Sequence, residues 1–222
     1  MQKSSLVGVG AALSIACHSK GPVPPSAAVT VSPDRVPALH VEAGHVSRQA
    51  EWLHIDDPGV RVVTQGSART TLGAQVDFVF RGASHDSVPL ASGEMRRQIG
   101  LKLRAQDTCN VVYVMWHIEP SPGVFVSVKR NEGAATHEAC GAGGYVNVKN
   151  EAAASMSFLV RKGERHSLRA ELEPSDARVL RVYADDVLAW SGVLPREALA
   201  FDGPSGLRTD NGAFDARLVV RP

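Results

Sequence analysis

The chain has little net charge and no long hydrophobic run beyond its first residues. Its 222 residues carry 24 Lys and Arg against 23 Asp and Glu, so the formal net charge is only +1. This balance provides no bulk attraction for nucleic acid or for an anionic membrane surface, so no nucleic-acid partner is expected. No second hydrophobic run reaches about 18 residues, so no membrane-spanning helix is expected either.

Several catalytic and cofactor-binding motifs are also absent. Gly141–Gly144 lacks the Lys-Ser/Thr pair of a P-loop, no G-x-G-x-x-G opens a helix, and no serine has a G-x-S-x-G setting. His137 and Glu138 lie beside Cys140 but have no H-E-x-x-H or CxxC spacing, which favours a disulfide-pinned loop over a metal site. The sequence therefore predicts no nucleotide binding, no hydrolase elbow and no cofactor.

The first 17 residues read as a bacterial secretory signal. Lys3 gives a positive start, Leu6–Ala16 is short and apolar, and Ser14–Cys17 resembles a lipobox, with Leu13 one place further out than usual. We predict that residues 1–16 are a lipoprotein signal peptide and that Cys17 is lipidated. The alternative is an ordinary signal peptide with an incidental cysteine.

The residue after Cys17 bears on location. It is His18 rather than Asp, which favours an outer-membrane lipoprotein, periplasmic or surface-exposed, attached to the membrane through its lipid alone. Residues 17–38 then form a Pro/Ser/Ala-rich flexible linker, and residues 39–222 are long enough for one domain with a sizeable core. We expect this domain to be a monomer.

Only two other cysteines are present, Cys109 and Cys140. In an exported protein they most simply form a disulfide, whereas a two-cysteine metal site lacks the usual partners. By the loop-entropy argument such a bond would contribute roughly 3–4 kcal/mol to stability.

Short alternating segments separated by turns predict an all-β sandwich, and nothing reads as a long amphipathic helix. Val111–Glu119 places four apolar side chains on one face, and Val124–Lys129 and Tyr145–Lys149 alternate in the same way. We also expect Trp52 to be a core anchor and Phe158–Val160 to form a strand. The long loop at residues 81–97 has a length that often carries function.

The last third of the chain carries the clearest turn signals. Leu180–Asp185 alternates, Asp185-Asp186 suits a tight turn, and Val187–Val193 reads as the return strand. A helical turn is expected at Arg196–Ala200. Asn211-Gly212 then predicts a second hairpin, joining Leu207–Asp210 to Phe214–Val220.

This C-terminal pattern resembles concanavalin A-like (laminin G-like) jelly-roll domains. The matching stretches are Val182–Ala189, Gly203–Asn211 and Phe214-Asp215, although Asp186 replaces the usual turn glycine. The resemblance implies a two-sheet antiparallel β-sandwich. It also implies that a saccharide could bind on the concave face of the central strands, and that the Thr209–Asp215 turn could offer oxygens to Ca²⁺; a plain turn is the alternative for Thr209–Asp215.

The second face of the central strands is the candidate binding surface. It groups aromatic, amide and charged side chains, and its alternative explanation is a half-exposed sheet face with cross-strand pairs. The residues on this face are Tyr113, Met115, His117, Glu119, Phe125, Ser127, Lys129, Tyr145, Asn147 and Lys149. The expected ligand-binding residues are Tyr113, His117, Glu119, Phe125, Lys129, Tyr145 and Asn147.

Three function classes remain open. The preferred one is a non-catalytic module of the cell envelope that binds carbohydrate or glycoconjugate. The second is a polysaccharide-active enzyme, which would need a second acid near Glu119, from Asp107 or the Ala83–Arg97 loop. The third is a module that binds an envelope protein through an apolar patch around Tyr113, Met115 and Phe125.

Overall fold

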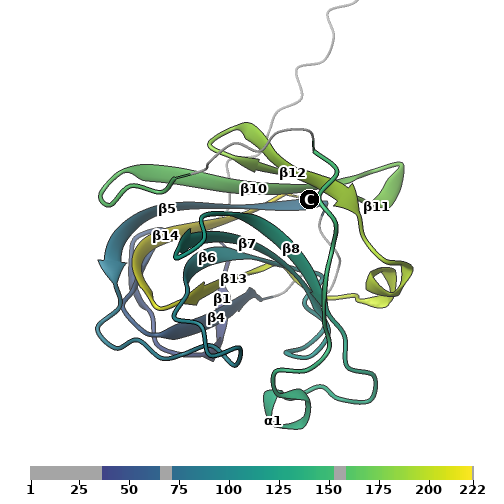
Figure 1. Ribbon diagram of the computed structural model, residues 1–222, viewed down its shortest axis with the longest axis horizontal. Helices are drawn as coiled ribbons and strands as arrows, with labels where there is room; N and C mark the ends of the chain where they lie inside the picture. The colour runs from purple at the N-terminus through teal and green to yellow at the C-terminus, as the bar shows by residue number, and fades with distance from the viewer. Residues whose placement is uncertain (1–36, 66–71, 153–158, 222) are drawn as a thin grey trace, which may run out of the picture. The chain divides into compact units, whose positions relative to one another are not determined.

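The protein is described by a computed structural model that covers residues 37–65, 72–152 and 159–221. These residues form two antiparallel sheets packed face to face (Figure 1), which confirms the predicted all-β sandwich. The N-terminal segment with the predicted signal and Cys17 lies outside the described residues. Within the described ranges, no helix is both long enough and apolar enough to cross a membrane.

The first sheet holds the strands expected to carry the site. Its order is β1 (Leu39–Ala43), β4 (Gly59–Thr64), β13 (Gly206–Asp210), β6 (Arg97–Leu103), β7 (Val111–Glu119), β8 (Gly123–Lys129) and β9 (Tyr145–Asn147). The last three strands are neighbours, as predicted, with Tyr113 opposite Ser127 and Ser127 opposite Asn147.

The second sheet contains the hairpin at Asp185-Asp186 and the longest strand, β5. Its order is β12 (Val187–Val193), β11 (Asp176–Ala184), β10 (Arg165–Glu173), β5 (Gly73–Ala83), β14 (Gly212–Arg221), β3 (Trp52–Ile55) and β2 (Ser47–Gln49). Two short helices, α1 (His137–Cys140) and the 3₁₀ helix η1 (Arg196–Ala200), lie in connections between strands.

The core lies between the sheets and follows the period-2 pattern of the strands. The apolar face of β7, formed by Val112, Val114, Trp116 and Ile118, is buried against the second sheet. Phe78 meets Trp116 edge to face at a ring-centroid distance of 5.6 Å. Edge-to-face packing suits the charge distribution of aromatic rings and adds to the benefit of burying them.

The Asp185-Asp186 hairpin is confirmed. Both residues have positive φ, 48° and 62°, and they join β11 to β12 with Ala184 opposite Val187. Two consecutive residues of positive φ define the turn whose twist matches that of a hairpin, and aspartate tolerates this conformation. The helical turn at Arg196–Ala200 is confirmed as well.

The second predicted hairpin, at Asn211-Gly212, is wrong. Asn211 does turn the chain with φ 55°, but β13 pairs with β4 and β6, whereas β14 pairs with β3 and β5. The turn therefore carries the chain from one sheet to the other. The turn preference of Asn-Gly is the same whether the two flanking strands pair with each other or lie in different sheets. Only the packing of the whole sandwich decides which neighbour each strand takes.

Two smaller predictions also need correction. Trp52 is not a core anchor, because Leu53 and Ile55 take the inward positions of β3 and place Trp52 on the outer face of the second sheet. The expected strand at Phe158–Val160 is not found at Leu159 and Val160, which are irregular, and Phe158 lies outside the described residues.

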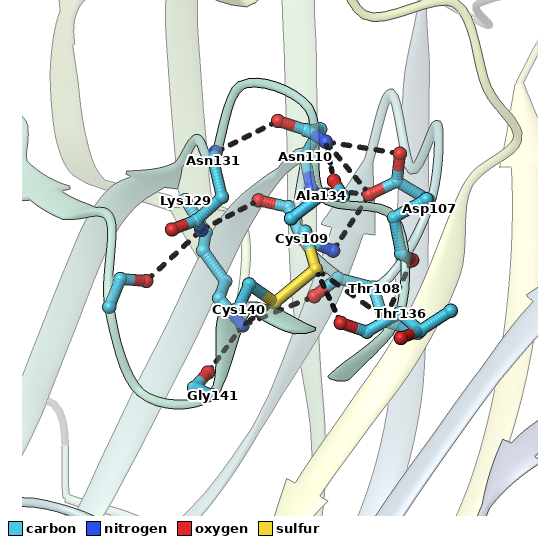
Figure 2. The surroundings of a disulfide bond; sticks show 12 residues. Asp107, Thr108, Cys109, Asn110, Lys129, Asn131, Ala134, Thr136, Cys140 and Gly141 are labelled. Carbon is cyan, nitrogen blue, oxygen red and sulfur yellow. Dashed lines mark hydrogen bonds between the residues drawn. A yellow bond between two sulfur atoms is a disulfide. The ribbon is translucent and has the colours of Figure 1, made fainter. Parts of the chain in front are cut away.

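The predicted disulfide between Cys109 and Cys140 is present. It ties the start of β7 to the end of α1 within the connection between β8 and β9 (Figure 2). The Lys129 ammonium crosses beneath it, donating hydrogen bonds to the carbonyl oxygens of Thr108 at 3.3 Å and Gly141 at 2.8 Å.

Candidate ligand-binding cleft

A cleft of about 920 Å³ lies over the outward face of the first sheet. This volume is near the upper end of the range for small-molecule sites, about 300–1,000 Å³. Its floor comes from alternate residues of β13, β6, β7, β8 and β9, because successive side chains of a strand point to opposite faces. The floor residues are Arg208, Asp210, Gln98, Tyr113, Met115, His117, Phe125, Ser127, Tyr145 and Asn147.

One wall is the loop between β5 and β6. Residues Val88–Ser92, Glu94 and Arg96 of this loop line the cleft. The buried side chain of Asn211 anchors the loop: its Oδ1 accepts from the Val88 N–H at 2.8 Å, and its Nδ2 donates to the carbonyls of Val88 at 2.8 Å and Arg96 at 3.2 Å. The turn between the two sheets therefore also positions a wall of the cleft.

The opposite wall is the disulfide-tied connection between β8 and β9. His137, Gly141 and Ala142 line the cleft from this side, and Tyr145 follows directly at the start of β9. Because Cys140 is bonded to Cys109 and Lys129 holds the Gly141 carbonyl, this wall is fixed to the first sheet at two points.

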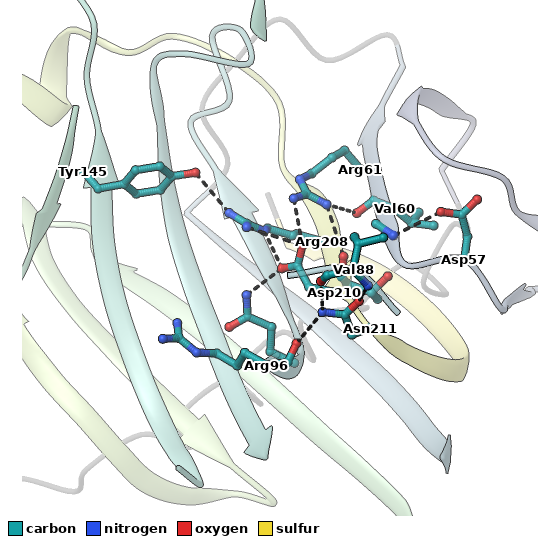
Figure 3. A network of polar contacts seen from close by, with 12 residues as sticks. Asp57, Val60, Arg61, Val88, Arg96, Tyr145, Arg208, Asp210 and Asn211 are labelled. Carbon is teal, nitrogen blue, oxygen red and sulfur yellow. Dashed lines mark hydrogen bonds and ion pairs between the residues drawn. The ribbon is translucent and has the colours of Figure 1, made fainter. Parts of the chain in front are cut away.

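A buried carboxylate organises the charged part of the floor (Figure 3). Asp210 is 2 % exposed and accepts hydrogen bonds from Arg61 Nη2 at 2.9 Å, Arg208 Nε at 2.8 Å and Gln98 Nε2 at 2.6 Å. Burial alone would raise the pKa of Asp210, but Arg208 and Arg61 hold it below its usual value. The carboxylate is therefore ionised, and the two guanidinium groups are fixed in place.

Two aromatic pairs stand beside this network. Tyr113 and Tyr145 stack with centroids 5.9 Å apart, while Arg208 lies 4.7 Å above the Tyr113 ring and donates to the Tyr145 hydroxyl at 3.2 Å. His117 and Phe125 stack at 4.2 Å. In each pair one ring is buried and the other is exposed, with Phe125 at 47 % and Tyr145 at 42 %.

The buried rings are held in their neutral forms. Burial raises the pKa of Tyr113 to about 12. Burial, together with the charge of Arg96, lowers the pKa of His117 to about 3. Arg96 Nη1 lies 3.4 Å from His117 Nε2, so the neutral imidazole accepts a hydrogen bond from the guanidinium. Neither ring therefore adds charge to the floor of the cleft.

Five of the seven predicted ligand-binding residues line the cleft together: Tyr113, His117, Phe125, Tyr145 and Asn147. Met115 and Ser127 of the same predicted face join them. Glu119 does not line it; its side chain is half exposed and pairs with Arg97 at the end of β7. Lys129 is 1 % exposed and lies under the disulfide. Its Nζ is 5.4 Å from the centroid of the Tyr145 ring, which lines the cleft.

The sequence missed the charged half of the floor. Arg61, Arg208 and Asp210 sit on two strands that are far apart in the chain and become neighbours only in the folded sheet. Arg208 and Asp210 alternate with Leu207 and Thr209, which are both buried. This alternation was a local signal that the two charged side chains lie on the outer face of the sheet. Nothing local showed that β13 takes a central position.

The two acids considered as catalytic partners of Glu119 already bind other groups of the protein. Asp107 accepts the backbone N–H groups of Cys109 and Asn110, each at 2.7 Å, in the turn before β7. Glu94, from the loop that forms the first wall, pairs with Arg96. Each of these carboxylates thus stabilises the cleft's frame.

The turn considered for Ca²⁺ does not gather its oxygens. Asp210 faces the cleft, whereas Asp215 lies on the outer face of the second sheet, bonded to His54 and Arg81. Among the described residues, no group of three or more His, Cys, Asp or Glu side chains could hold a metal ion.

No known protein family matches the chain by sequence. No curated protein matches it either. Solved structures do match in three dimensions. The carbohydrate recognition domain of Emp46p, in its metal-free form, is 10 % identical, covers 84 % of this chain and 88 % of its own, and gives a TM-score of 0.50.

Two further matches have lower TM-scores. Domain 4 of AbnA, a GH43 arabinanase of Geobacillus stearothermophilus in complex with arabinotriose, is 9 % identical over 81 % of this chain and 77 % of its own, at a TM-score of 0.42. A tetrameric galectin from the sponge Cinachyrella is 11 % identical over 74 % of this chain and 100 % of its own, at 0.40. With its two antiparallel sheets, the chain therefore has the concanavalin A-like jelly-roll fold that its C-terminal motifs predicted.

Proposed function

We propose that the protein is a non-catalytic module that binds carbohydrate in the cleft over the first sheet. The observation that carries this proposal is the pair of half-exposed aromatic rings, Phe125 and Tyr145, each backed by a buried ring in the same cleft. A sugar ring has an apolar face that packs on an aromatic ring and hydroxyl groups that need hydrogen-bonding partners. Ser127, Asn147 and the Tyr145 hydroxyl provide such partners in the cleft lining.

The charges of the cleft favour a neutral saccharide. Arg61 and Arg208 share the carboxylate of Asp210, and Arg96 pairs with Glu94. Because each of these guanidinium groups already has an anionic partner, no group in the cleft requires a charged ligand. Hydroxyl groups can instead add to the remaining donors and acceptors without separating an ion pair.

The two rival classes have less support. A protein-binding patch around Tyr113, Met115 and Phe125 would need exposed apolar side chains, but Tyr113 and Met115 are 4 % and 5 % exposed. An enzyme would need carboxylates free to act on substrate, and the two that line the cleft, Glu94 and Asp210, are bound to arginines. The likeness to the Emp46p domain supports the fold on which such a binding site is built.

The test is calorimetric titration of the purified protein with a panel of neutral oligosaccharides. We expect a saturable signal with at least one member, weakened roughly tenfold by Phe125→Ala or Tyr145→Ala, because ring stacking contributes about 0.5–1.5 kcal/mol beyond the area buried. Tyr183→Ala, an aromatic truncation on the outer face of the second sheet, is the matched control and should bind as the parent does. Failure of every glycan to bind, or equal loss in the control, would refute the proposal.

We also propose that Cys17 carries a lipid and tethers the domain to the outer membrane through residues 18–38. The support is the sequence alone: a positive start, a short apolar core and a lipobox-like Ser14–Cys17, followed by His18. A tethered module of this kind would hold glycans of the cell envelope, or glycans reaching it, near the membrane.

A further inference from the structure

The outer face of the second sheet carries its own depression, remote from the cleft. It has a volume of about 540 Å³ and is lined by residues of β2, β3, β5, β10 and β14 and by Ala50. Its centre follows one row of the sheet, in which Arg165, Val79, Asp215 and His54 lie opposite one another in register. Trp52 and Arg81 complete the surround.

Positive groups outnumber negative ones here. Asp215 is the one carboxylate in the lining, and it accepts from Arg81 Nε at 2.8 Å and pairs with His54 Nδ1 at 2.8 Å. Burial would raise the pKa of Asp215, but His54 and Arg81 hold it below its usual value, so the carboxylate is ionised. Arg81 and His54 remain 50 % and 59 % exposed, and Arg81 Nη1 carries N–H donors that Asp215 does not use.

Within the described residues, the Arg165 side chain makes one long ion pair and no hydrogen bond. Its nearest carboxylate oxygen, on Asp77, is 3.7 Å away. That same oxygen already accepts from Arg217 Nη2 at 2.6 Å and Nε at 3.2 Å, while Gln75 holds the other oxygen at 2.7 Å. Asp77 is therefore shared among Arg217, Gln75 and Arg165, and Arg165 keeps N–H donors that its long ion pair with Asp77 does not use.

Trp52 fixes the position of that available guanidinium. The Arg165 Cζ lies 4.9 Å above the Trp52 ring, an arrangement that orients the planar group and leaves its N–H edges pointing outward. A guanidinium held in this way loses less side-chain entropy when it binds a planar or tetrahedral oxyanion with two parallel hydrogen bonds.

We propose that this depression is a second binding site, one that accepts an anionic oxo group: a carboxylate, a sulfate ester or a phosphate ester. Arg165 is the principal ligand, Arg81 supplies further donors from the other side, and Trp52 provides an apolar surface for whatever carries the anion. The proposal does not rest on carbohydrate binding in the cleft, because the two sites use opposite faces of the sandwich and share no residue.

The tryptophans give a direct readout. Trp116 and Trp190 are each 1 % exposed, so a collisional quencher in solution reports on Trp52. At constant ionic strength, anionic iodide should quench the fluorescence more strongly than cationic caesium. Inorganic phosphate, inorganic sulfate or glucuronate should protect Trp52 saturably, and the order of their affinities identifies which oxo group the site prefers. Trp52→Phe should abolish the quenchable fraction and so confirm its source.

The matched variants separate a built site from general surface charge. Arg165→Gln should reduce the protecting affinity roughly tenfold or more, because it removes charge-assisted hydrogen bonds. Arg181→Gln removes another exposed arginine of the same sheet, 47 % exposed against 59 % for Arg165, whose charge pairs with Glu173, and should leave protection unchanged. Equal quenching by iodide and caesium, protection by none of the three anions, protection by neutral glucose instead, or an equal effect of the two variants would overturn the proposal.

Discussion

At the scale of single residues, the cleft depends on buried ionisable groups whose charge state is set by their neighbours. Asp210 remains ionised at 2 % exposure because two arginines and an amide bind it. Breaking such a buried pair by removing one partner costs about 3–5 kcal/mol, because the remaining charge is left uncompensated. The same burial keeps Tyr113 and His117 uncharged, so the floor combines a fixed ionic network with two neutral rings.

His117 makes stability depend on pH in a predictable direction. Its pKa is lowered to about 3 in the folded protein, whereas the unfolded chain has the ordinary value of 6.5. Between these values the unfolded state binds a proton that the folded state excludes, so stability falls as pH drops below 6.5. We expect His117 to account for a loss of about 2 kcal/mol between pH 7 and pH 5.

Urea unfolding of the parent and of His117→Gln at both pH values measures this contribution. The variant loses the ring stack on Phe125 at every pH, so only the change between the two pH values is informative. The parent should lose about 2 kcal/mol more than the variant, since the other histidines contribute equally to both proteins. Identical pH dependence in the two proteins would show that His117 titrates normally in the fold.

At the scale of elements, the connection between β8 and β9 is a wall that the disulfide holds in place. The bond closes a sequence separation of 31 residues, and the loop-entropy argument assigns it about 3–4 kcal/mol. The double variant Cys109→Ser/Cys140→Ser should lose about this much stability in urea. In the folded state, amide hydrogens of residues 130–147 should exchange faster, because hydrogen bonds such as those from Thr108, Asn110 and Lys129 then hold this connection without the covalent link.

The central strands β5, β10 and β14 serve as the internal reference for that exchange measurement. They are paired on both sides in the second sheet and should retain their protection in the double variant. If glycan binding in the cleft is measured in parallel, it should weaken as well, because Tyr145 follows the loosened wall. Uniform acceleration throughout both sheets would mean that the bond stabilises the whole domain without holding this wall.

The sequence predicted elements well wherever their signal was local. The alternation in Val111–Glu119 identified β7 to its exact ends, and it separated the core face from the face that lines the cleft. The consecutive aspartates Asp185 and Asp186 identified the hairpin between β11 and β12, and both residues have positive φ in the structure. In each case a period of two or a turn preference expressed the same geometry that the folded strand adopts.

The sequence failed where the neighbour of a strand had to be known. The β13 strand has only five residues, and its place between β4 and β6 depends on contacts with residues more than a hundred positions away. Gly206 shows why β13 and β4 fit together: a Cβ there would lie 2.1 Å from the Val62 carbonyl oxygen, so only glycine permits the close approach of these two strands. Neither the long-range strand pairing nor the close backbone approach can be inferred from a single sequence.

At the scale of the whole molecule, the sandwich presents two outer faces of different chemistry. The first sheet carries a cleft with paired charges and exposed aromatic rings, and the second carries a depression in which the weakly paired Arg165 lies over Trp52. Because the apolar core lies between the sheets, substitutions on one outer face should leave binding on the other unchanged. One domain could thus contact a neutral saccharide and an anionic group at the same time.

The proposed lipid anchor involves residues outside the domain, so it is tested on the full chain. In a bacterial host that processes lipoproteins, the parent chain should fractionate with membranes, incorporate a labelled fatty acid and leave the membrane only with detergent. Cys17→Ser should lose the label and appear in the soluble periplasmic fraction, because the lipid is the only proposed attachment. Cys109→Ser/Cys140→Ser, which leaves Cys17 intact, should still be labelled, and it controls for the general loss of a cysteine. A Cys17→Ser chain that remained with the membrane would show that attachment has another source, and the domain would then have to be placed in the envelope by a partner.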